Sequence, residues 1–381
     1  MTGWTLHCSR CARVEPSNAR ATVCADCGQP FLVAYEDLPL SREALLPRWD
    51  MWRYSAFLPL LPGERPVSLG EGGTPLLELP GLAREIGVRR LWVKDEGLNP
   101  TGSFKARGMS AAVTRAHAMG VAGLVVPTAG NAGAALAAYG AAAGLPVRVF
   151  APDSTPRSIL ATIRSLGAEL VTTPGHIGDC GKAARAFAAE SGYFDVSTLR
   201  EPYRIEGKKT MGIELAEQLG WRLPGVIIYP TGGGTGLIGM WKAFGELRQK
   251  KWLDPQAPLP RMIVAQAEGC APIVRAFSSG EEAAAPWANP ETHASGLRVP
   301  APLGDRLILR ALRESDGYAA SASEAEIRRN TARLSRCSGI DTSPEGGCAL
   351  SVLEQTVKQR WIDSTSEVVV FNTGSGAGYR C

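Results

Sequence analysis

The sequence TGSFKAR at residues 101–107 places one lysine, Lys105, in a polar turn between a short apolar segment and a helix-compatible run. The apolar segment is Leu-Trp-Val at 91–93, and the helix is predicted over 106–119. A lysine there lies at the positive end of the helix macrodipole, which disfavours its ammonium form and favours an imine with an aldehyde. The alternative is a solvated lysine that opens a helix.

Two further segments have the same order of apolar strand, glycine-containing turn and helix. TAGNAG at 128–133 contains Asn131, follows the apolar residues 124–126 and leads into an alanine-rich helix. TGGGTG at 231–236 follows the apolar residues 226–229 and opens another helix. Such turns leave backbone N–H groups free for an anion such as phosphate, although a tight connection without a ligand is the alternative. A phosphate cradle and an imine-forming lysine together predict a cofactor.

The order of several motifs resembles that of the fold-type II pyridoxal-phosphate (PLP) enzymes, and within them the threonine synthase family. These motifs are a four-cysteine start, GEGGTPL at 70–76, KDE at 94–96, the lysine motif at 99–105, PYRIEG at 202–207, the glycine loop and Thr-Gly at 373–374. The resemblance covers nearly the whole chain. It implies pyridoxal 5'-phosphate as cofactor and a small amino acid as substrate.

The resemblance also implies roles for individual residues. Lys105 is similar to the lysine that binds the cofactor as an imine, and Asn131 to the asparagine that hydrogen-bonds the ring hydroxyl. Thr373 is similar to the Ser or Thr that faces the pyridine nitrogen, where a neutral hydroxyl would favour elimination and replacement over transamination. On position alone, Thr373 fits an ordinary threonine after a buried strand equally well. The implied phosphate-binding loop consists of Gly232, Gly233, Gly234, Thr235 and Gly236.

For the reaction, the resemblance implies elimination of phosphate from O-phosphohomoserine and addition of water to give threonine. Arg204 would bind the substrate phosphate, since a guanidinium binds phosphate bidentately; a surface arginine is the alternative. Glu345, in SPEGG at 343–347, either faces the cofactor pocket or serves in a turn.

The chain departs from the threonine synthase pattern at several positions. Those enzymes usually have Lys-Asp-Arg after Ser-Phe, hydroxyl residues on both sides of the SGN triplet, and Asn-Ser before Val-Asn-Pro-Tyr-Arg. Here these places hold Ala106, Ala129, Ala132 and Thr198-Leu199. Three functions therefore stay open: the favoured threonine-synthase-like lyase, a PLP-dependent serine or threonine ammonia-lyase that forms a 2-oxo acid, and a catalytically silent PLP-binding protein.

The first four of the nine cysteines have the paired spacing of a zinc ribbon. Cys8 and Cys11, and then Cys24 and Cys27, form two Cys-X2-Cys pairs that can bring four thiolates to one tetrahedral ion. A closed four-thiolate site predicts a structural zinc ion without a catalytic role. A ribbon that has lost its metal, or two disulfides formed on oxidation, are the alternatives.

The βαβ rhythm after the ribbon predicts an α/β fold with largely parallel sheets. Apolar strand candidates lie at 91–93, 124–126, 147–150, 169–172, 226–229, 262–267 and 368–372. The expected fold class is a fold-type II PLP enzyme with two parallel-sheet α/β domains and an N-terminal zinc-ribbon-like module. The expected boundaries are 1–38 for the ribbon, 39–109 and 212–381 for a large PLP-binding domain, and 110–211 for a small mobile domain.

Composition narrows the class of protein. The 381 residues are 45% hydrophobic and 20% charged, with a net charge of +4 and no dense basic stripe, so no nucleic-acid partner is expected. The N-terminus lacks a signal-like segment, and no long apolar run is present, so we expect no membrane association and a cytoplasmic protein. The resembling fold commonly dimerises, which predicts a homodimer.

Overall fold

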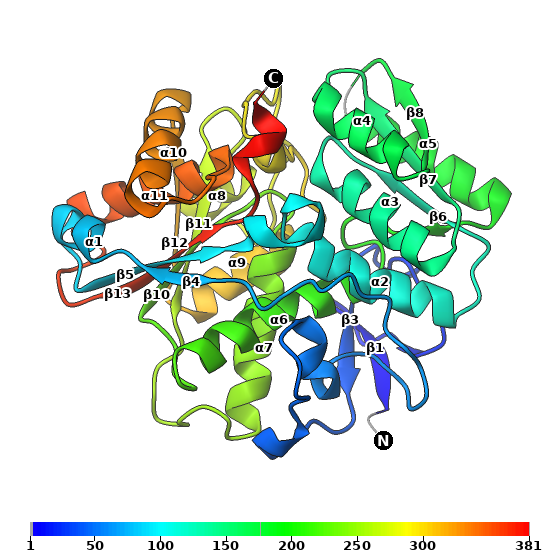
Figure 1. Ribbon diagram of the computed structural model, residues 1–381, viewed down its shortest axis with the longest axis horizontal. Helices are drawn as coiled ribbons and strands as arrows, with labels where there is room; N and C mark the ends of the chain where they lie inside the picture. Colours follow the sequence, from blue (N-terminus) through cyan, green and yellow to red (C-terminus); the bar gives the residue numbers. More distant parts are fainter. Residues whose placement is uncertain (1–2, 176, 381) are drawn as a thin grey trace.

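The computed structural model describes residues 3–175 and 177–380 and contains three sheets in that part of the chain (Figure 1). The N-terminal sheet is antiparallel, in the order β2-β1-β3. Its strands are β1 (Trp4–Cys8), β2 (Val14–Pro16) and β3 (Phe31–Tyr35). A six-stranded and a four-stranded sheet make up the rest.

The six-stranded sheet has the order β12-β11-β10-β13-β5-β4 and is parallel except for β4, which pairs antiparallel with β5 at one edge. Its strands, in that order, are Tyr318–Ala322, Arg261–Ala267, Val226–Pro230, Glu367–Asn372, Arg90–Asp95 and Leu76–Glu78. The four-stranded sheet is parallel, in the order β8-β7-β6-β9. Its strands, in that order, are Glu169–Thr173, Val147–Pro152, Leu124–Pro127 and Phe194–Asp195.

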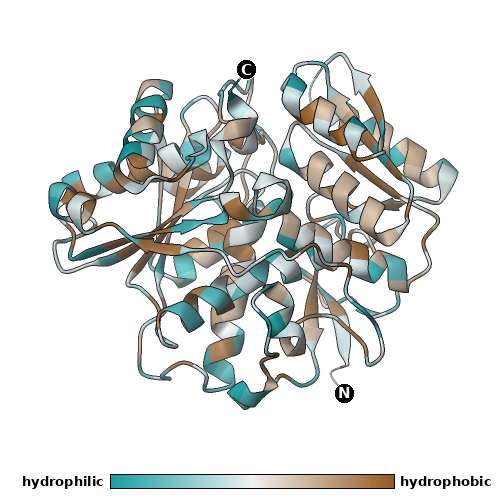
Figure 2. Ribbon diagram, viewed as in Figure 1, coloured by the Kyte–Doolittle hydropathy of each residue, from teal (hydrophilic) through white to brown (hydrophobic). Residues whose placement is uncertain are grey.

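Helices cover both faces of the six-stranded sheet, as expected for buried parallel strands. Val226 and Ile228 pack on one face with α1 (Pro80–Ile86), α10 (Glu324–Ser338) and α11 (Pro344–Lys358). Ile227 and Tyr229 pack on the other face with four helices. These are α6 (Tyr203–Gln218), α7 (Thr235–Gln249), α8 (Pro272–Ser278) and α9 (Asp305–Glu314). In Figure 2 these strands are mainly brown, whereas α10 on the surface is largely teal.

The four-stranded sheet is likewise enclosed by helices. Val149 packs on one face with α2 (Lys105–Ala118), α3 (Asn131–Ala143) and α4 (Arg157–Ser165), and the opposite face holds Phe150 against α5 (Ile177–Ser191). The N-terminal sheet joins the same core, because Trp4 and Phe31 lie in one apolar cluster with α2 and α3. The ribbon is therefore packed against the body of the protein.

The seven predicted strands are all present, and the helix predicted after Lys105 begins at that residue. After the ribbon, the predicted strands missed β4, β9 and β12. Strands β4 and β9 are short, and β12 (YAASA) carries mostly alanine and serine instead of large apolar residues. The parallel α/β class is confirmed, while the proposed domain boundaries stay a prediction. No helix within the described residues has the length and apolar character needed to cross a bilayer.

Candidate active site

Three loops that carry predicted site residues leave the six-stranded sheet on the same side, at the edge formed by the carboxyl ends of its parallel strands. Strands β10, β13 and β5 are parallel neighbours, so their carboxyl ends lie side by side. Thr231 follows β10, Thr373 follows β13, and the chain after β5 makes two short 3-10 turns, Glu96–Leu98 and Pro100–Gly102, before Lys105. Open α/β sheets bind ligands outside the carboxyl ends of their strands. This edge is therefore the candidate active site.

Backbone hydrogen bonds join the lysine loop to the loop after β13. Phe104 N–H donates to Thr373 O at 3.1 Å, and Ser375 N–H donates to Gly102 O at 2.8 Å. Between them, a Cβ built on Gly374 would lie 3.5 Å from Asn131 Nδ2, which places α3 of the other sheet at the same point. The structure thus brings Lys105, Thr373 and Asn131 together from three distant segments.

Lys105 is the first residue of α2 and is half-buried. Its Nζ lies 3.8 Å from the centre of the Phe104 ring. Burial lowers the pKa of Lys105 to about 7, helped by the cation of Arg204 and opposed by the carboxylate of Glu345. A lysine with such a pKa holds a large fraction of neutral amine near pH 7, which is the form that attacks an aldehyde or accepts a proton. The side chain is therefore not an ordinary solvated lysine.

The glycine loop presents free backbone donors at the start of α7. Within the described residues, the N–H groups of 232–236 donate to no protein acceptor. A Cβ on Gly232 would lie 2.2 Å from Gly296 O, and Gly234 has a φ of +72°. Side chains at either position would disturb the turn, so glycine keeps these donors available. Free N–H groups and the positive helix end form an anion site.

Arg204 is buried at 1% exposure in the first turn of α6, so its assignment as a surface arginine is wrong. Its Nη1 donates to Val196 O at 2.8 Å, while its Nε has no partner within the described residues. The nearby Glu201 carboxylate accepts hydrogen bonds from the Tyr203 and Arg204 backbone N–H groups. Burial raises the pKa of Glu201 to about 7, against the opposing effect of Arg204.

The residues that depart from the threonine synthase pattern lie at or near this edge. Thr198 packs on the glycine loop, since its Cγ2 would lie 2.9 Å from a Cβ on Gly233. Leu199 has a φ of +63°, which is strained for a leucine. Ala106 is buried next to Lys105, and Ala132 is in the first turn of α3. Thr198 therefore lies against the glycine loop of the candidate site, whereas Ala106 and Leu199 are buried in apolar clusters.

Two charged residues of the site were not assigned a role from the sequence. Lys208 is one helical turn after Arg204 on α6, and its Nζ donates to Thr235 Oγ1 in the glycine loop at 2.6 Å. Glu345, for which two interpretations were open, accepts hydrogen bonds from Gly296 N–H at 2.9 Å and Tyr379 O–H at 2.6 Å. The spacing of four between Arg204 and Lys208 was the available signal, because such residues share one helix face.

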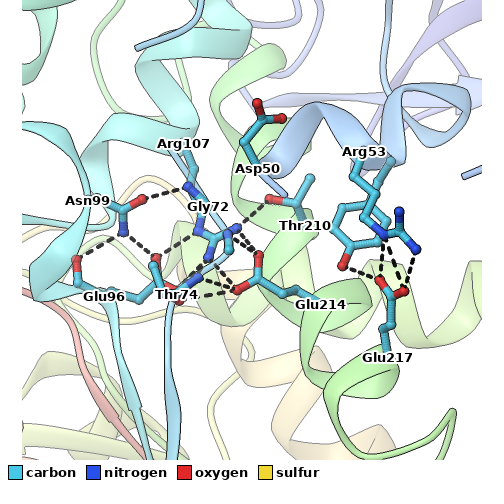
Figure 3. Close-up of polar contacts among 12 residues, drawn as sticks. Asp50, Arg53, Gly72, Thr74, Glu96, Asn99, Arg107, Thr210, Glu214 and Glu217 are labelled. Carbon is cyan, nitrogen blue, oxygen red and sulfur yellow. Dashed lines mark hydrogen bonds and ion pairs between the residues drawn. The ribbon is translucent and has the colours of Figure 1, made fainter. Parts of the chain in front are cut away.

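Arg107, two residues after Lys105, fixes the start of α2 through a buried ionic network (Figure 3). Its guanidinium binds both oxygens of Glu96, at 2.7 and 2.8 Å, and both oxygens of Glu214, at 2.9 and 3.1 Å. The same group donates to the hydroxyls of Thr74 and Thr210. The network ties α2 to α6 and to the chain after β5, and thereby positions the lysine loop.

Burial alone would favour the neutral form of Glu214, but Arg107 and Lys94 hold the pKa of that carboxyl well below its usual range. Lys94 Nζ also donates to Gln218 Oε1 at 2.8 Å. The network is therefore ionised and internally satisfied, which is the condition for tolerating buried charge.

The four N-terminal cysteines form a second cluster, far from Lys105 in sequence. Their Sγ atoms all lie within 4.8 Å of one another, and all four are free thiols. The distances are 3.4 Å for Cys8–Cys27, 3.6 Å for Cys11–Cys24 and 3.7 Å for Cys11–Cys27. Four thiolates at about 2.3 Å around a tetrahedral zinc ion would be separated by about 3.8 Å. The cluster has the size of a zinc site.

Comparison with known proteins identifies the family. Residues 67–374 match the family described as pyridoxal-phosphate dependent enzyme. This chain belongs to that family. Pyridoxal phosphate is therefore the cofactor that the residues at this edge of the six-stranded sheet have to fit.

Curated relatives of this pyridoxal-phosphate dependent enzyme include threonine synthases. The threonine synthase of Methanosarcina acetivorans is 35% identical over 373 residues, covering 97% of this chain and 91% of the relative. That of Methanocaldococcus jannaschii is 34% identical over 375 residues, with the same coverage of 97% and 91%. The Mycobacterium bovis threonine synthase is 35% identical over 324 residues, covering 85% of this chain and 86% of the relative.

Solved structures show the same fold. A threonine deaminase from T.th. has a TM-score of 0.66 and 27% identity, covering 79% of this chain and 92% of that structure. Maize serine racemase has a TM-score of 0.68 and 21% identity, covering 80% of this chain and 88% of that structure. Together with the parallel sheets, these similarities establish a fold-type II pyridoxal-phosphate enzyme.

The residues at the sheet edge fit this cofactor. The free N–H groups of the glycine loop suit its phosphate, and the hydroxyl of Thr373 and the side chain of Asn131 form no hydrogen bond within the described residues. Both are therefore available to a ring placed beside Lys105. A buried site with free donors and a neutral hydroxyl meets the needs of a phosphorylated pyridine aldehyde.

Proposed function

We propose that this enzyme is a threonine-synthase-type lyase that eliminates phosphate from O-phosphohomoserine and adds water to give threonine. The observation that carries the proposal is the buried Arg204 beside Lys105, because a guanidinium that forms no ion pair suits a phosphate leaving group. The identity of about 35% to named threonine synthases over nearly the whole chain supports the same activity.

The bound cofactor supplies an electron sink for the negative charge that develops on the substrate carbon. In the proposal, Lys105 would hold the cofactor, and its free amine would accept the proton from the substrate Cα. Its pKa of about 7 suits a base at neutral pH. Asn131 would donate to the ring hydroxyl, and the N–H groups of 232–236 would bind the cofactor phosphate. The neutral hydroxyl of Thr373 would serve the ring nitrogen without protonating it, which would favour elimination.

A substrate panel tests the proposal. Purified enzyme is offered O-phosphohomoserine, threonine and serine, and inorganic phosphate and 2-oxo acid are measured in parallel. We expect phosphate and threonine from O-phosphohomoserine and little 2-oxo acid. Formation of 2-oxo acid from the unphosphorylated amino acids would instead identify an ammonia-lyase. The alternative is favoured by Ala106, Ala129 and Ala132, which stand where threonine synthases have polar residues. Binding of the cofactor without turnover of any of the three would indicate a catalytically silent protein.

The variant Arg204→Gln tests the role of the guanidinium. Its KM for O-phosphohomoserine should rise by about 10- to 100-fold, the range for one charge-assisted hydrogen-bonding group. Any slow turnover of unphosphorylated serine should stay unchanged, because serine has no phosphate to bind. Arg157→Gln, at the exposed start of α4, is the control and should behave as wild type. An unchanged preference for the phosphorylated substrate in Arg204→Gln would refute the phosphate role.

We also propose that Cys8, Cys11, Cys24 and Cys27 hold one structural zinc ion, supported by their spacing and the close approach of their sulfur atoms. The Cys27→Ser variant should lose the zinc measured by elemental analysis. Because Trp4 and Phe31 of the ribbon pack into the core with α2 and α3, its Tm should fall by about 5–10 °C. Cys337→Ser, at an exposed thiol, should keep both zinc and Tm. Equal Tm values for the two variants would argue against a structural ion.

A further inference from the structure

Two of the six buried lysine and arginine residues in the described ranges form no ion pair, and both lie at the candidate active site. Lys94, Arg107, Arg115 and Lys209 each pair with a carboxylate. Arg204 and Lys208 do not, although each is at most 1% exposed. A buried basic group without a paired opposite charge is unfavourable, so these two residues call for an anion that is part of the functional state.

The contrast is sharpest between Lys208 and its neighbour Lys209 on α6. Lys209 Nζ lies 2.6 Å from Glu206 Oε2 and 2.9 Å from Glu246 Oε2. Lys208 contacts the other end of α7, where its Nζ donates to the Thr235 hydroxyl, and it lies 4.7 Å from the Phe104 ring centre. An ammonium has three donors, and only one is used here. Lys208 therefore has donor capacity left beside the glycine loop.

Packing holds Lys208 in this position. Its Cε passes over Gly108 in α2, where a Cβ would lie 2.9 Å away, so glycine at residue 108 leaves space for the stem. The acceptor Thr235 is the first residue of α7, and the free N–H groups of 232–236 surround it in sequence. The ammonium is thus directed at the end of the helix that presents the anion site.

We propose that Lys208 binds the 5'-phosphate of the cofactor together with the glycine loop, supplying the one side-chain charge in a cradle otherwise made of backbone N–H groups. The inference rests on the proposed cofactor site and not on the identity of the substrate. Burial, with the cations of Arg204 and Lys105, pushes the pKa of Lys208 well below its usual value despite the opposing effect of the Glu201 carboxylate, so a dianion beside it would restore the charged form.

The experiment compares two aldehydes that differ only in the phosphate. Cofactor-free wild type, Lys208→Gln and Lys208→Arg are titrated with pyridoxal phosphate and with pyridoxal, and Kd is read from the absorbance change without any amino acid present. In Lys208→Gln, the Kd for pyridoxal phosphate should rise by about 10- to 100-fold, and the Kd for pyridoxal should not change. Lys208→Arg, which keeps the charge, should restore most of the affinity.

Lys182→Gln, on the exposed side of α5, controls for the loss of one positive charge and should match wild type with both aldehydes. Inorganic phosphate should raise the Tm of the cofactor-free wild type more than that of Lys208→Gln. An equal rise in the Kd for both aldehydes, or no rise in the Kd for either, would overturn the proposal. Weakened binding of O-phosphohomoserine with unchanged Kd for pyridoxal phosphate would also overturn it, by assigning Lys208 to the substrate. Failure of wild type to bind either aldehyde would overturn the cofactor site itself.

Discussion

Replacing Lys105 with alanine should abolish covalent attachment of the cofactor and lower turnover by at least about 10²- to 10⁴-fold, the contribution of a positioned acid–base group. The reason is that one amine is assigned two tasks, holding the cofactor and accepting the Cα proton. Its half-buried position at the start of α2, with a pKa of about 7, suits both tasks. The measurement is borohydride reduction followed by peptide mapping, with turnover assayed in parallel.

In the wild type, the reduced label should map to the peptide that contains Lys105, and the Lys105→Ala variant should carry none. Lys182→Ala, at an exposed lysine of α5, should be labelled and active as wild type. Lys208 is the most informative competitor, because its amine lies near the same Phe104 ring. A label on Lys208, or retained activity without Lys105, would show that the lysine has been misassigned.

Replacing Arg107 with alanine should lower the free energy of unfolding by about 3–5 kcal/mol, the cost of removing one partner from a buried ion pair. The variant leaves Glu96 without its cation in a fully buried position, and Glu214 would retain only Lys94. Chemical denaturation of the cofactor-free protein measures the change. Because the network also positions the lysine loop, cofactor affinity should fall as well.

The control is Arg329→Ala, which removes the ion pair with Glu354 on the surface of α10, where the arginine side chain is 60% exposed. Exposed pairs contribute about 0.2–1 kcal/mol, so this variant should be nearly neutral. If both variants lost the same amount of stability, the buried network would not be holding the start of α2.

Acidification gives an independent check of the buried network. The pKa of Glu214 is depressed in the folded state, so its contribution should disappear as the pH falls below the ordinary carboxyl range.

The sequence was sufficient for the parallel α/β class because its buried strands are continuous apolar runs bounded by turns. Val226–Pro230 and Glu367–Asn372 are examples, and each is followed by a glycine-containing loop. It was not sufficient for β12, whose alanine and serine residues pair at the sheet edge only because β11 offers a partner. Tertiary context outweighs local preference there.

The candidate site shows the same division. Recognisable local motifs contain Lys105, Asn131 and the glycine loop, and the fold brings these motifs to the carboxyl ends of the parallel strands. Lys208 was missed because a Lys-Lys pair in a polar helix normally indicates a solvated face. Only the packing of α6 between α2 and α7 shows that one of the two lysines is ion-paired and the other is not. Charge balance within a core depends on partners distant in sequence, and no local pattern reports it.

The proposed phosphate role of the buried Lys208 on α6 would link the vitamin B6 supply to the persistence of the protein. In the proposed arrangement, a chain without cofactor must bury Lys208 with no paired counter-charge, whereas the phosphate dianion of the bound cofactor would offset this cost. Newly made molecules that meet a scarce vitamin would spend longer in opened forms that proteases attack. The abundance of the enzyme would then follow the nutritional state before any change in gene expression.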